Sequence, residues 1–226
     1  MNRKELSQVR IRLNEFTNSL LPLMGRRERR RWGYLYIQGL LLDGGRKTAS
    51  TIAQQLDGDA QAIQQFLSQS PWDCIAVRRR LAALMSQAIS SRPAWVIDDT
   101  GFPKKGKGSV CVARQYSGTL GKIGNCQIGV SLNCATNDGC FPLDFQLYMP
   151  EEWANDLKRR AKAGIPLETD FKTKWQISLD MIDQAISWEI PQGVIVTDAG
   201  YGVASDFRAK LRERKLEYIV GIQNQN

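Results

Sequence analysis

Two short segments of the chain combine aspartates with the pattern of a buried strand. Asp98 and Asp99 follow the apolar run 94–97, and one hundred residues after Asp98, Asp198 follows the apolar run 194–197. Short apolar runs bounded by turn-forming residues are typical of buried strands. We therefore expect each strand to deliver a carboxylate at its end, into a glycine-containing turn. Two such carboxylates together could hold one or two magnesium ions, which prefer oxygen ligands and activate water for phosphoryl transfer.

The first segment offers two neighbouring carboxylates. Adjacent side chains of a strand point to opposite faces of its sheet, so Asp98 and Asp99 cannot both face one metal unless a bulge intervenes. We favour Asp98 because it ends the apolar run, and Asp99 is the alternative.

The composition restricts the chemistry further. Histidine is absent from the 226 residues, which excludes Ser-His and Cys-His nucleophiles and histidine metal sites. The five cysteines show no CxxC spacing, so disulfide staples and a zinc knuckle are disfavoured and a reducing cytoplasm fits best. Carboxylates must therefore carry any catalysis.

Positive charge dominates the chain. The net charge is +8 and the sequence pI is about 9.4, which favours a polyanionic partner such as nucleic acid or an anionic membrane surface. Basic clusters either form a solvated surface or contact phosphates, which arginine forks match bidentately. The candidate DNA-binding residues in these clusters are Arg29, Arg30, Arg31, Arg78, Arg79, Lys104, Lys105 and Lys107.

The first ninety residues have helical periodicity. Amphipathic patterns cover 6–20 and 32–42, and a further helix is expected over 74–89. Residues 48–56 and 60–69 predict two short helices around Asp57-Gly58-Asp59. This arrangement is either a DNA-reading helix-turn-helix or a simple helical hairpin with a polar outer face. Gln61, Gln64, Gln65 and Ser68 would lie on that outer face, and glutamine can pair with adenine in the major groove.

After residues 90–93, the expected domain boundary, the pattern becomes β-rich. Strands are expected over 109–114, 128–135 and 141–148, paired antiparallel because their connections are too short for crossover helices. Helices are expected over 151–163, 171–188 and 204–214, with a last strand over 218–221. This order predicts an α/β fold with a mixed sheet. No apolar run is long enough to cross a bilayer, and no signal peptide is expected.

Several blocks together resemble the DDE transposases of bacterial insertion sequences, whose nuclease domain has a ribonuclease-H-like fold. The resemblance rests on residues 97–106, 113–127, 150–153 and 198–202, with further similarity at 29–32 and 70–73. It covers essentially the whole chain.

The resemblance implies a helical DNA-binding domain over residues 1–90 and a ribonuclease-H-like DDE nuclease domain over 91–226. It implies binding to double-stranded transposon ends, with strand cleavage and strand transfer in cut-and-paste transposition (DNA recombination). Mg²⁺ or Mn²⁺ would be held by Asp98, less favourably Asp99, as the first ligand and Asp198 as the second. A cytoplasmic location, no membrane partner and a possible homodimer are also expected.

The resemblance also indicates that the active site is incomplete. The third ligand of the family is a glutamate on a later helix, whereas Glu213 and Glu217 lie too close to Asp198 in sequence to replace it. We therefore expect a nuclease domain without its C-terminal part, inactive alone, with an exposed sheet face and a tendency to self-associate. One alternative is an active nuclease completed by Glu151 or Glu152. Another is a non-catalytic DNA-binding regulator or competitor derived from a transposase.

Overall fold

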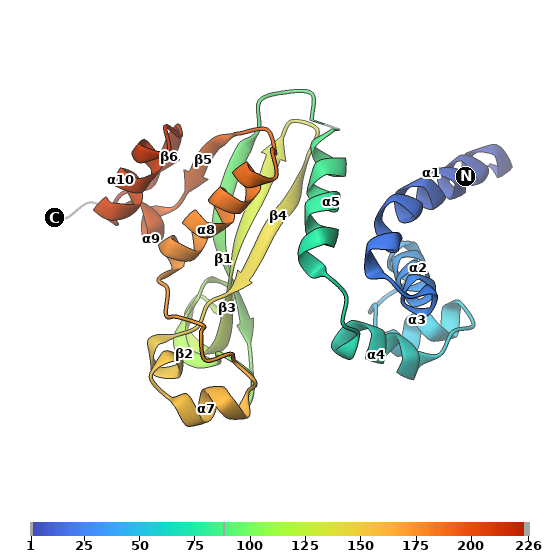
Figure 1. The fold of residues 1–226 in the computed structure, drawn as a ribbon, viewed down its shortest axis with the longest axis horizontal. Coiled ribbons are helices and arrows are strands. Elements are labelled where there is room, and N and C mark those ends of the chain that lie inside the picture. Colours follow the sequence, from blue (N-terminus) through green and yellow to red (C-terminus); the bar gives the residue numbers. More distant parts are fainter. Residues whose placement is uncertain (1, 88, 224–226) are drawn as a thin grey trace. The chain divides into compact units, whose positions relative to one another are not determined.

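The computed structural model describes residues 2–87 and 89–223, and the chain forms two compact units that are described separately (Figure 1). The helical unit extends to Leu81 and the sheet unit begins at Ala82, both within one helix. The division into functional domains at residue 90 stays a prediction. Residue 88, which fell within the helix expected over 74–89, lies outside the described residues.

The helical unit confirms the predicted succession of helices. Asn2 caps the first helix. Its side-chain oxygen accepts from the Glu5 N–H at 2.9 Å, and the Glu5 carboxylate accepts from the Asn2 N–H at 2.8 Å. The elements are α1 (Arg3–Leu20), η1 (Leu21–Met24), α2 (Arg27–Leu41), α3 (Ala49–Gln55), α4 (Ala60–Gln69) and α5 (Cys74–Ser86).

Packing around α2 organises this unit. Gly39 of α2 lies so close to α3 that an added Cβ would be 2.4 Å from the Cγ2 atom of Ile52, which is fully buried. Ile63 and Phe66 of α4 are buried as well, Ile63 against α3 and Phe66 in a cluster with Leu20. The three helices α2, α3 and α4 therefore form one packed body.

The sheet unit contains six strands. Its elements are β1 (Ala94–Pro103), β2 (Ala113–Ser117), η2 (Gly118–Leu120), β3 (Lys122–Thr136), β4 (Gly139–Leu147), α6 (Glu151–Ala154), α7 (Leu157–Lys162), α8 (Lys174–Ser187), β5 (Val194–Thr197), α9 (Ala199–Gly202), α10 (Ser205–Glu213) and β6 (Tyr218–Val220). The strand order is β2-β3-β1-β5-β6, and β4 pairs with the remaining length of β3. The pairs among β1 to β4 are antiparallel, whereas β1–β5 and β5–β6 are parallel. The mixed α/β sheet expected from the sequence is confirmed.

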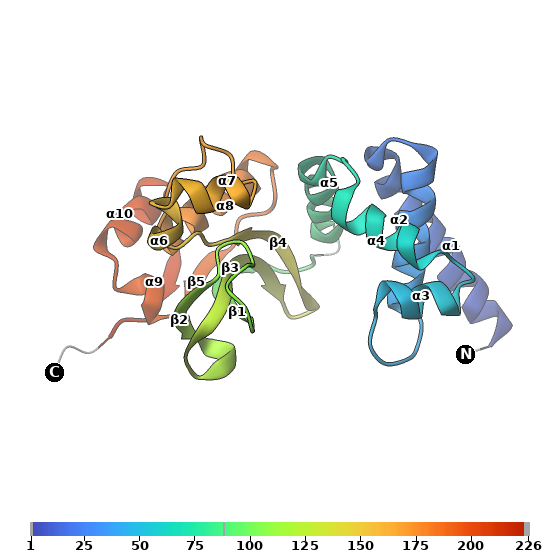
Figure 2. The ribbon, with the colours of Figure 1, turned by 90° about the horizontal axis from the view of Figure 1, so that it is seen from below.

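Helices cover one face of this sheet. In Figure 2, α6, α7, α8 and α10 lie on the same side of the strands. Trp95 and Ile97 of β1 pack there with Met181 of α8 and Phe207 of α10, all at most 2% exposed. Burial of such large apolar side chains contributes about 1.5–3 kcal/mol each.

Large apolar side chains are exposed elsewhere on the strands. Phe102, Phe145, Leu147 and Ile219 are 39, 45, 42 and 67% exposed. The rings of Phe102 and Phe145 meet edge to face at 6.0 Å. The expectation of an exposed sheet face agrees with these side chains, whereas self-association stays a prediction.

Four predicted boundaries were wrong. β1 does not end before Asp98, because its pairing with β3 continues without a shift to Pro103. The strand expected over 109–114 begins only at Ala113, since Cys111 has a φ of +59° and turns the chain. Gly124, expected in a turn, pairs within β3. The helix expected over 151–163 is two short helices, with Asp156 capping the second.

All five cysteines are free thiols. Cys74 and Cys140 are exposed, whereas Cys111, Cys126 and Cys134 are buried. Burial raises the pKa of Cys126, and it raises the pKa of Cys111 and of Cys134 to about 11. Because the thiolate is the reactive form, the three buried thiols should be inert in the folded protein.

Titration of the folded protein with Ellman's reagent near pH 8 should therefore show two reactive thiols, and the other three should react only after unfolding. The double variant Cys74→Ser/Cys140→Ser serves as the control and should show no fast reaction. Any fast-reacting thiol in this variant would contradict the described packing.

Candidate active site

Asp98 of β1 and Asp198, the residue after β5, lie beside each other. The last paired residues of β1 and β5 are Ile97 and Thr197, and the two aspartates follow them directly. Neighbouring strands are about 4.8 Å apart, and residues in register point to the same face. Both aspartates are exposed. The structure thus brings together two carboxylates that are one hundred residues apart in the sequence.

Each of these carboxylates uses one oxygen locally. Oδ1 of Asp98 accepts from the Asp99 N–H at 2.7 Å, and Oδ1 of Asp198 accepts from the Gly200 N–H at 2.9 Å, which caps α9. Within residues 2–87 and 89–223, no hydrogen bond to Oδ2 of either aspartate is present. These oxygens are free to bind a cation.

The glycine that ends α9 explains part of the motif around Asp198. A Cβ on Gly202 would be 1.8 Å from the carbonyl oxygen of Gly221, at the end of β6. Only glycine allows this approach. The short helix therefore packs against β6 and holds its capping residue, Asp198, at the end of β5.

Asp99 points to the other face of β1, which α8 covers. Its carboxylate forms an ion pair with Lys174, the first residue of α8, and accepts a hydrogen bond from the Tyr201 hydroxyl of α9. Side-chain exposure is 33% for Lys174 and 26% for Asp99. Asp99 thus joins β1 to two helices, and the choice of Asp98 over Asp99 as a metal ligand stays a prediction.

Tyr201 lies within electrostatic reach of all three aspartates. Its pKa is raised, first by burial and then by the negative charges of Asp99, Asp198 and Asp98. Sequence reasoning identified the Asp198–Gly202 block but missed the roles of Tyr201 and Lys174. Tyr201 could have been suspected only from its place between two glycines, and Lys174 carried no signal.

The lysine segment after β1 lines a separate cavity. Lys105 and Lys107 contribute to a volume of 520 Å³ that is also lined by Arg114 of β2, Asn125 of β3 and Arg159 of α7. The Asn125 amide donates to the carbonyl oxygens of Lys104 and Gly106, at 2.8 and 2.9 Å, and so fixes this segment. Lys104 is half-buried.

Arg159 is held rigidly in this cavity, and sequence reasoning missed it. Its guanidinium lies 3.8 Å from the centre of the Trp153 ring and donates to the Val112 carbonyl at 3.2 Å. Its Nη1 atom also forms an ion pair with Oε1 of Glu152 at 3.4 Å. An acidic partner and a stacked tryptophan restrain Arg159, while Lys105 and Lys107 stay exposed.

The predicted arginines of the helical unit differ in availability. Arg29 is half-buried and donates to the Pro71 carbonyl at 2.7 Å, so it fixes the segment before α5. Arg31 lies 5.0 Å from the centre of the Trp32 ring. The exposed members of the set are Arg30, Arg31 and Arg79, whereas Arg78 is half-buried. Phosphate contacts by any of these residues stay predictions.

The alternative carboxylates lie elsewhere. Glu217 pairs with Arg92 at 3.0 Å, beside the start of β5 rather than its end, and Glu213 pairs with Lys210 on α10. Glu151 is the exposed first residue of α6, and Glu152 pairs with Arg159 at 3.4 Å. Within the described part of the chain, no three acidic or cysteine side chains cluster as metal ligands.

Comparison with known proteins identifies the family. The family model described as "DDE superfamily endonuclease" matches residues 19–226, which covers both carboxylate segments. The chain belongs to this superfamily. It is also 34% identical, over 194 residues, to a protein of Microchaete diplosiphon described as "Probable transposase for insertion sequence element IS701". That alignment covers 84% of this chain and 48% of the relative, so the chain spans about half the length of the curated relative.

Membership of the DDE superfamily confirms the resemblance drawn from the sequence and fits the mixed α/β sheet. Endonucleases of this superfamily typically use divalent metal ions. No helix in the described part of the chain is long and apolar enough to span a membrane.

The two neighbouring aspartates should differ sharply in their effect on stability. We expect Asp99→Asn to lower the free energy of unfolding by about 1–3 kcal/mol, because Lys174 loses its charged partner and Tyr201 a strong acceptor. Asp98→Asn should change it by less than about 0.5 kcal/mol, or raise it slightly, since it removes repulsion from Asp198. Urea unfolding of both variants measures the difference. Equal losses would show that Asp99 does not have the positioning role.

The raised pKa of Tyr201 predicts a dependence on alkaline pH. The folded protein holds this proton more tightly than the unfolded chain, so the stabilisation is complete below the ordinary tyrosine pKa of about 10 and is lost above it. Urea unfolding between about pH 9 and 11 should therefore show a smaller fall in stability for Tyr201→Phe than for the parent protein. Tyr116→Phe, at an exposed tyrosine, is the matched control. Parallel pH profiles for the parent and Tyr201→Phe would contradict the prediction.

Proposed function

We propose that this chain is the DNA-binding and metal-binding part of an insertion-sequence transposase, acting on double-stranded transposon ends by metal-dependent strand cleavage and strand transfer in cut-and-paste transposition. The observation that carries this proposal is the position of Asp98 and Asp198, which directly follow Ile97 and Thr197, the last residues paired between β1 and β5. Family membership and the similarity to a protein described as a transposase support it.

The donor set at the two aspartates fits magnesium or manganese. Both side chains offer a free carboxylate oxygen, and Mg²⁺ is commonly held by one or two carboxylates together with phosphate oxygens of the substrate. Asp98 and Asp198 would hold the ion. When bound, such an ion activates water and stabilises the leaving oxygen in phosphoryl transfer. Asp99 would hold α8 and α9 against β1 beside this site, through Lys174 and Tyr201.

Two carboxylates are one fewer than the acidic triad of the family. Because no group of three potential ligands occurs in the described residues, we expect the pair to bind metal but to support little or no cleavage in this chain alone. A cytoplasmic protein that acts as a homodimer would fit this function.

A non-catalytic regulator is the second candidate. The distribution of charge favours it, because residues 1–81 contain 14 Lys and Arg against 7 Asp and Glu. This strongly basic unit could occupy DNA without help from the carboxylates and compete for transposon ends.

Metal binding and cleavage test the proposal together. Manganese binding, measured by calorimetry, should be lost in Asp98→Asn and in Asp198→Asn but kept in Asp170→Asn, which changes an exposed loop residue. Duplexes taken from the DNA flanking this coding sequence should be bound by the parent protein and both site variants. Any cleavage in Mg²⁺ or Mn²⁺ should disappear in both site variants.

The outcomes separate the two candidates. DNA binding without manganese binding would favour the regulator and contradict the proposed metal site. Strong cleavage that needs Asp198 would instead show that the chain already contains its third ligand, against our expectation of inactivity.

A further inference from the structure

The segment from α3 to α4 has the dimensions of a helix-turn-helix. α3 has seven residues and α4 has ten, and residues 56–59 form the turn. Asp57 has a φ of +50°, next to Gly58, so the chain reverses sharply. A turn of three to four residues, often with glycine, is characteristic of this motif. Both helices pack on α2 and on each other, so they form one rigid body.

The two faces of α4 differ completely. Ile63 and Phe66 are buried, at 0 and 3% exposure, and fix the helix to the body of the unit. The exposed residues are uncharged and, apart from Leu67, polar: Gln61, Gln64, Gln65, Ser68 and Gln69. They line a hollow of 320 Å³ along the helix. No tertiary hydrogen bond to the four glutamine side chains is present in the described residues, so their amides are available.

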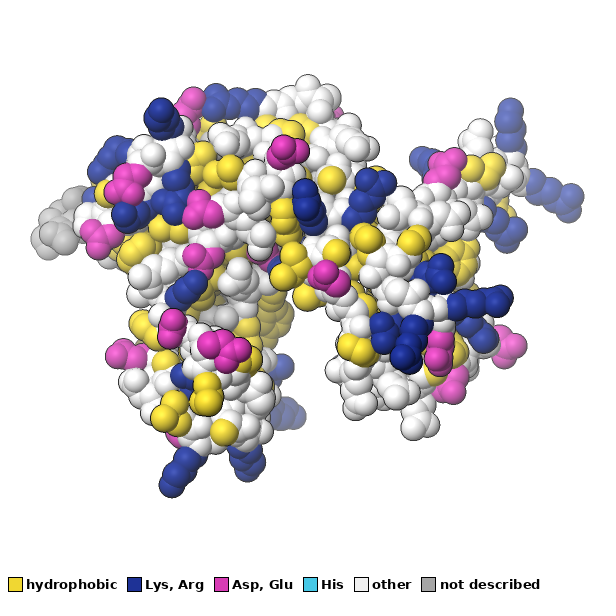
Figure 3. Space-filling view, viewed as in Figure 1, with side chains coloured by type: hydrophobic (Ala, Val, Ile, Leu, Met, Phe, Trp, Pro, Cys, Tyr) yellow, Lys and Arg dark blue, Asp and Glu magenta, His cyan; other side chains and the backbone are white. Residues whose placement is uncertain are grey.

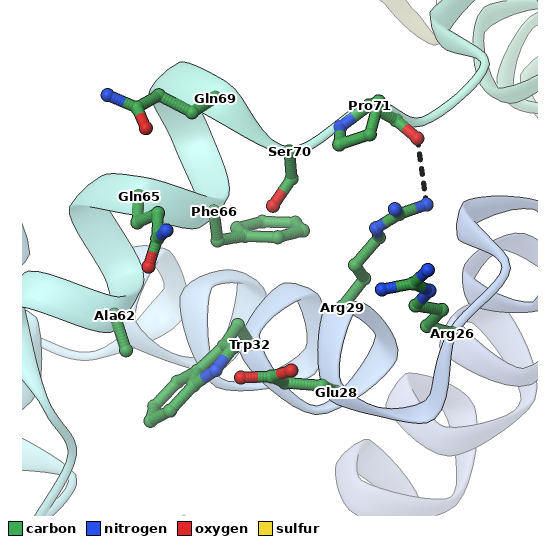
Figure 4. A pocket seen from close by; sticks show the side chains of 10 residues that line it. All are labelled: Arg26, Glu28, Arg29, Trp32, Ala62, Gln65, Phe66, Gln69, Ser70 and Pro71. Atoms are coloured by element: carbon green, nitrogen blue, oxygen red, sulfur yellow. Dashed lines mark hydrogen bonds between the residues drawn. The ribbon is translucent and has the colours of Figure 1, made fainter.

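Arginines from another helix flank this polar face. Figure 4 shows Gln65 and Gln69 on one wall of a cavity of 280 Å³, with Arg26 and Arg29 on the other. Arg29 is directed at the Pro71 carbonyl, at 2.7 Å, whereas Arg26 is exposed at the start of α2. Glu28 also lines the cavity but lies nearer Trp32 in this view.

The helix α4 is uncharged, whereas the unit that carries it is strongly basic. α4 itself contains no charged residue, and the helical unit around it has a net charge of +7. In Figure 3, Lys and Arg side chains gather over the visible face of this unit. Two acids lie near α4: Glu28 lines the cavity described above, and Asp59 is the N-cap of α4, where it accepts from the Gln61 and Ala62 N–H groups. An uncharged helix on a basic body suits a DNA groove better than a protein partner of either charge.

We propose that α4 enters the major groove of duplex DNA and reads adenine-containing base pairs through Gln61, Gln64 and Gln65, while Arg26 contacts a flanking phosphate. Glutamine can donate to N7 and accept from N6 of adenine in one bidentate pair. A helix of ten residues is about 15 Å long, which corresponds to about four base pairs. This inference rests on the proposed function, and it names the element that supplies sequence specificity.

Selection from a duplex library with a randomised central segment tests the proposal. The complete 226-residue chain is used, without divalent metal, so that cleavage cannot interfere. The parent protein should enrich a motif of about four base pairs that contains A·T pairs. No enriched motif would overturn the proposal.

Substitutions then assign the motif to α4. Gln61→Ala/Gln65→Ala should relax the motif and weaken binding to the selected duplex by about tenfold for each adenine that is no longer read, while binding to unselected duplex stays the same. Gln8→Ala/Gln54→Ala removes exposed glutamines of α1 and α3 and should change neither. Arg26→Gln should weaken binding to all duplexes alike and lower the salt dependence by about one ion.

Two results would contradict the assignment to α4. The first is an unchanged motif in Gln61→Ala/Gln65→Ala, which would make this face the polar surface of an ordinary helical hairpin. The second is an effect of Arg26→Gln that depends on sequence. Failure of the proposed catalytic function is distinguishable, because a selected motif without manganese binding by Asp98 and Asp198 would leave the reading helix intact.

Discussion

Strand β1 is paired along both edges, and this double pairing constrains everything around it. On one edge it forms an unbroken antiparallel ladder with β3, and on the other a parallel ladder with β5. Since neither ladder shifts, each residue of β1 has a fixed face. Trp95 and Ile97 face the helices and form part of the core, while Asp98, one residue beyond the Ile97–Thr197 pair, points to the opposite face. Core formation and assembly of the carboxylate pair are therefore one event.

Much of this arrangement was predictable from local patterns. The apolar runs before Asp98 and Asp198 predicted strands β1 and β5, whereas the turn expected after Asp198 is the short helix α9. The length of β1 was not predictable, because residues 98–103 are held as a strand by β3 rather than by their own sequence. The partners of Asp99 could not be predicted from the sequence either. Lys174 and Tyr201 lie 75 and 102 residues away from it, and only the packing of α8 and α9 brings them together.

The two units differ in their charge. Nearly all of the net charge lies in residues 1–81, where seven of the eight excess positive charges are found. The sheet unit is almost neutral, and its cations are partly paired, as Arg159 is with Glu152. Affinity for a polyanion should therefore come chiefly from the helical unit, while the carboxylate pair contributes a local negative site that attracts DNA only when a cation bridges them.

Asp98 and Asp99 are chemically identical, and only their parity along β1 gives them different tasks. Inserting or deleting one residue between Trp95 and Asp98 would keep both aspartates in the sequence but exchange their faces. The carboxylate beside Asp198 and the partner of Lys174 would then trade places, while Trp95, which precedes the change, would keep its buried face. Length changes in the loop 104–112 carry no such penalty, since no ladder runs through it. A length change within β1 therefore disturbs either the core or the carboxylate pair, whereas one in the loop 104–112 leaves both faces of the strand in place.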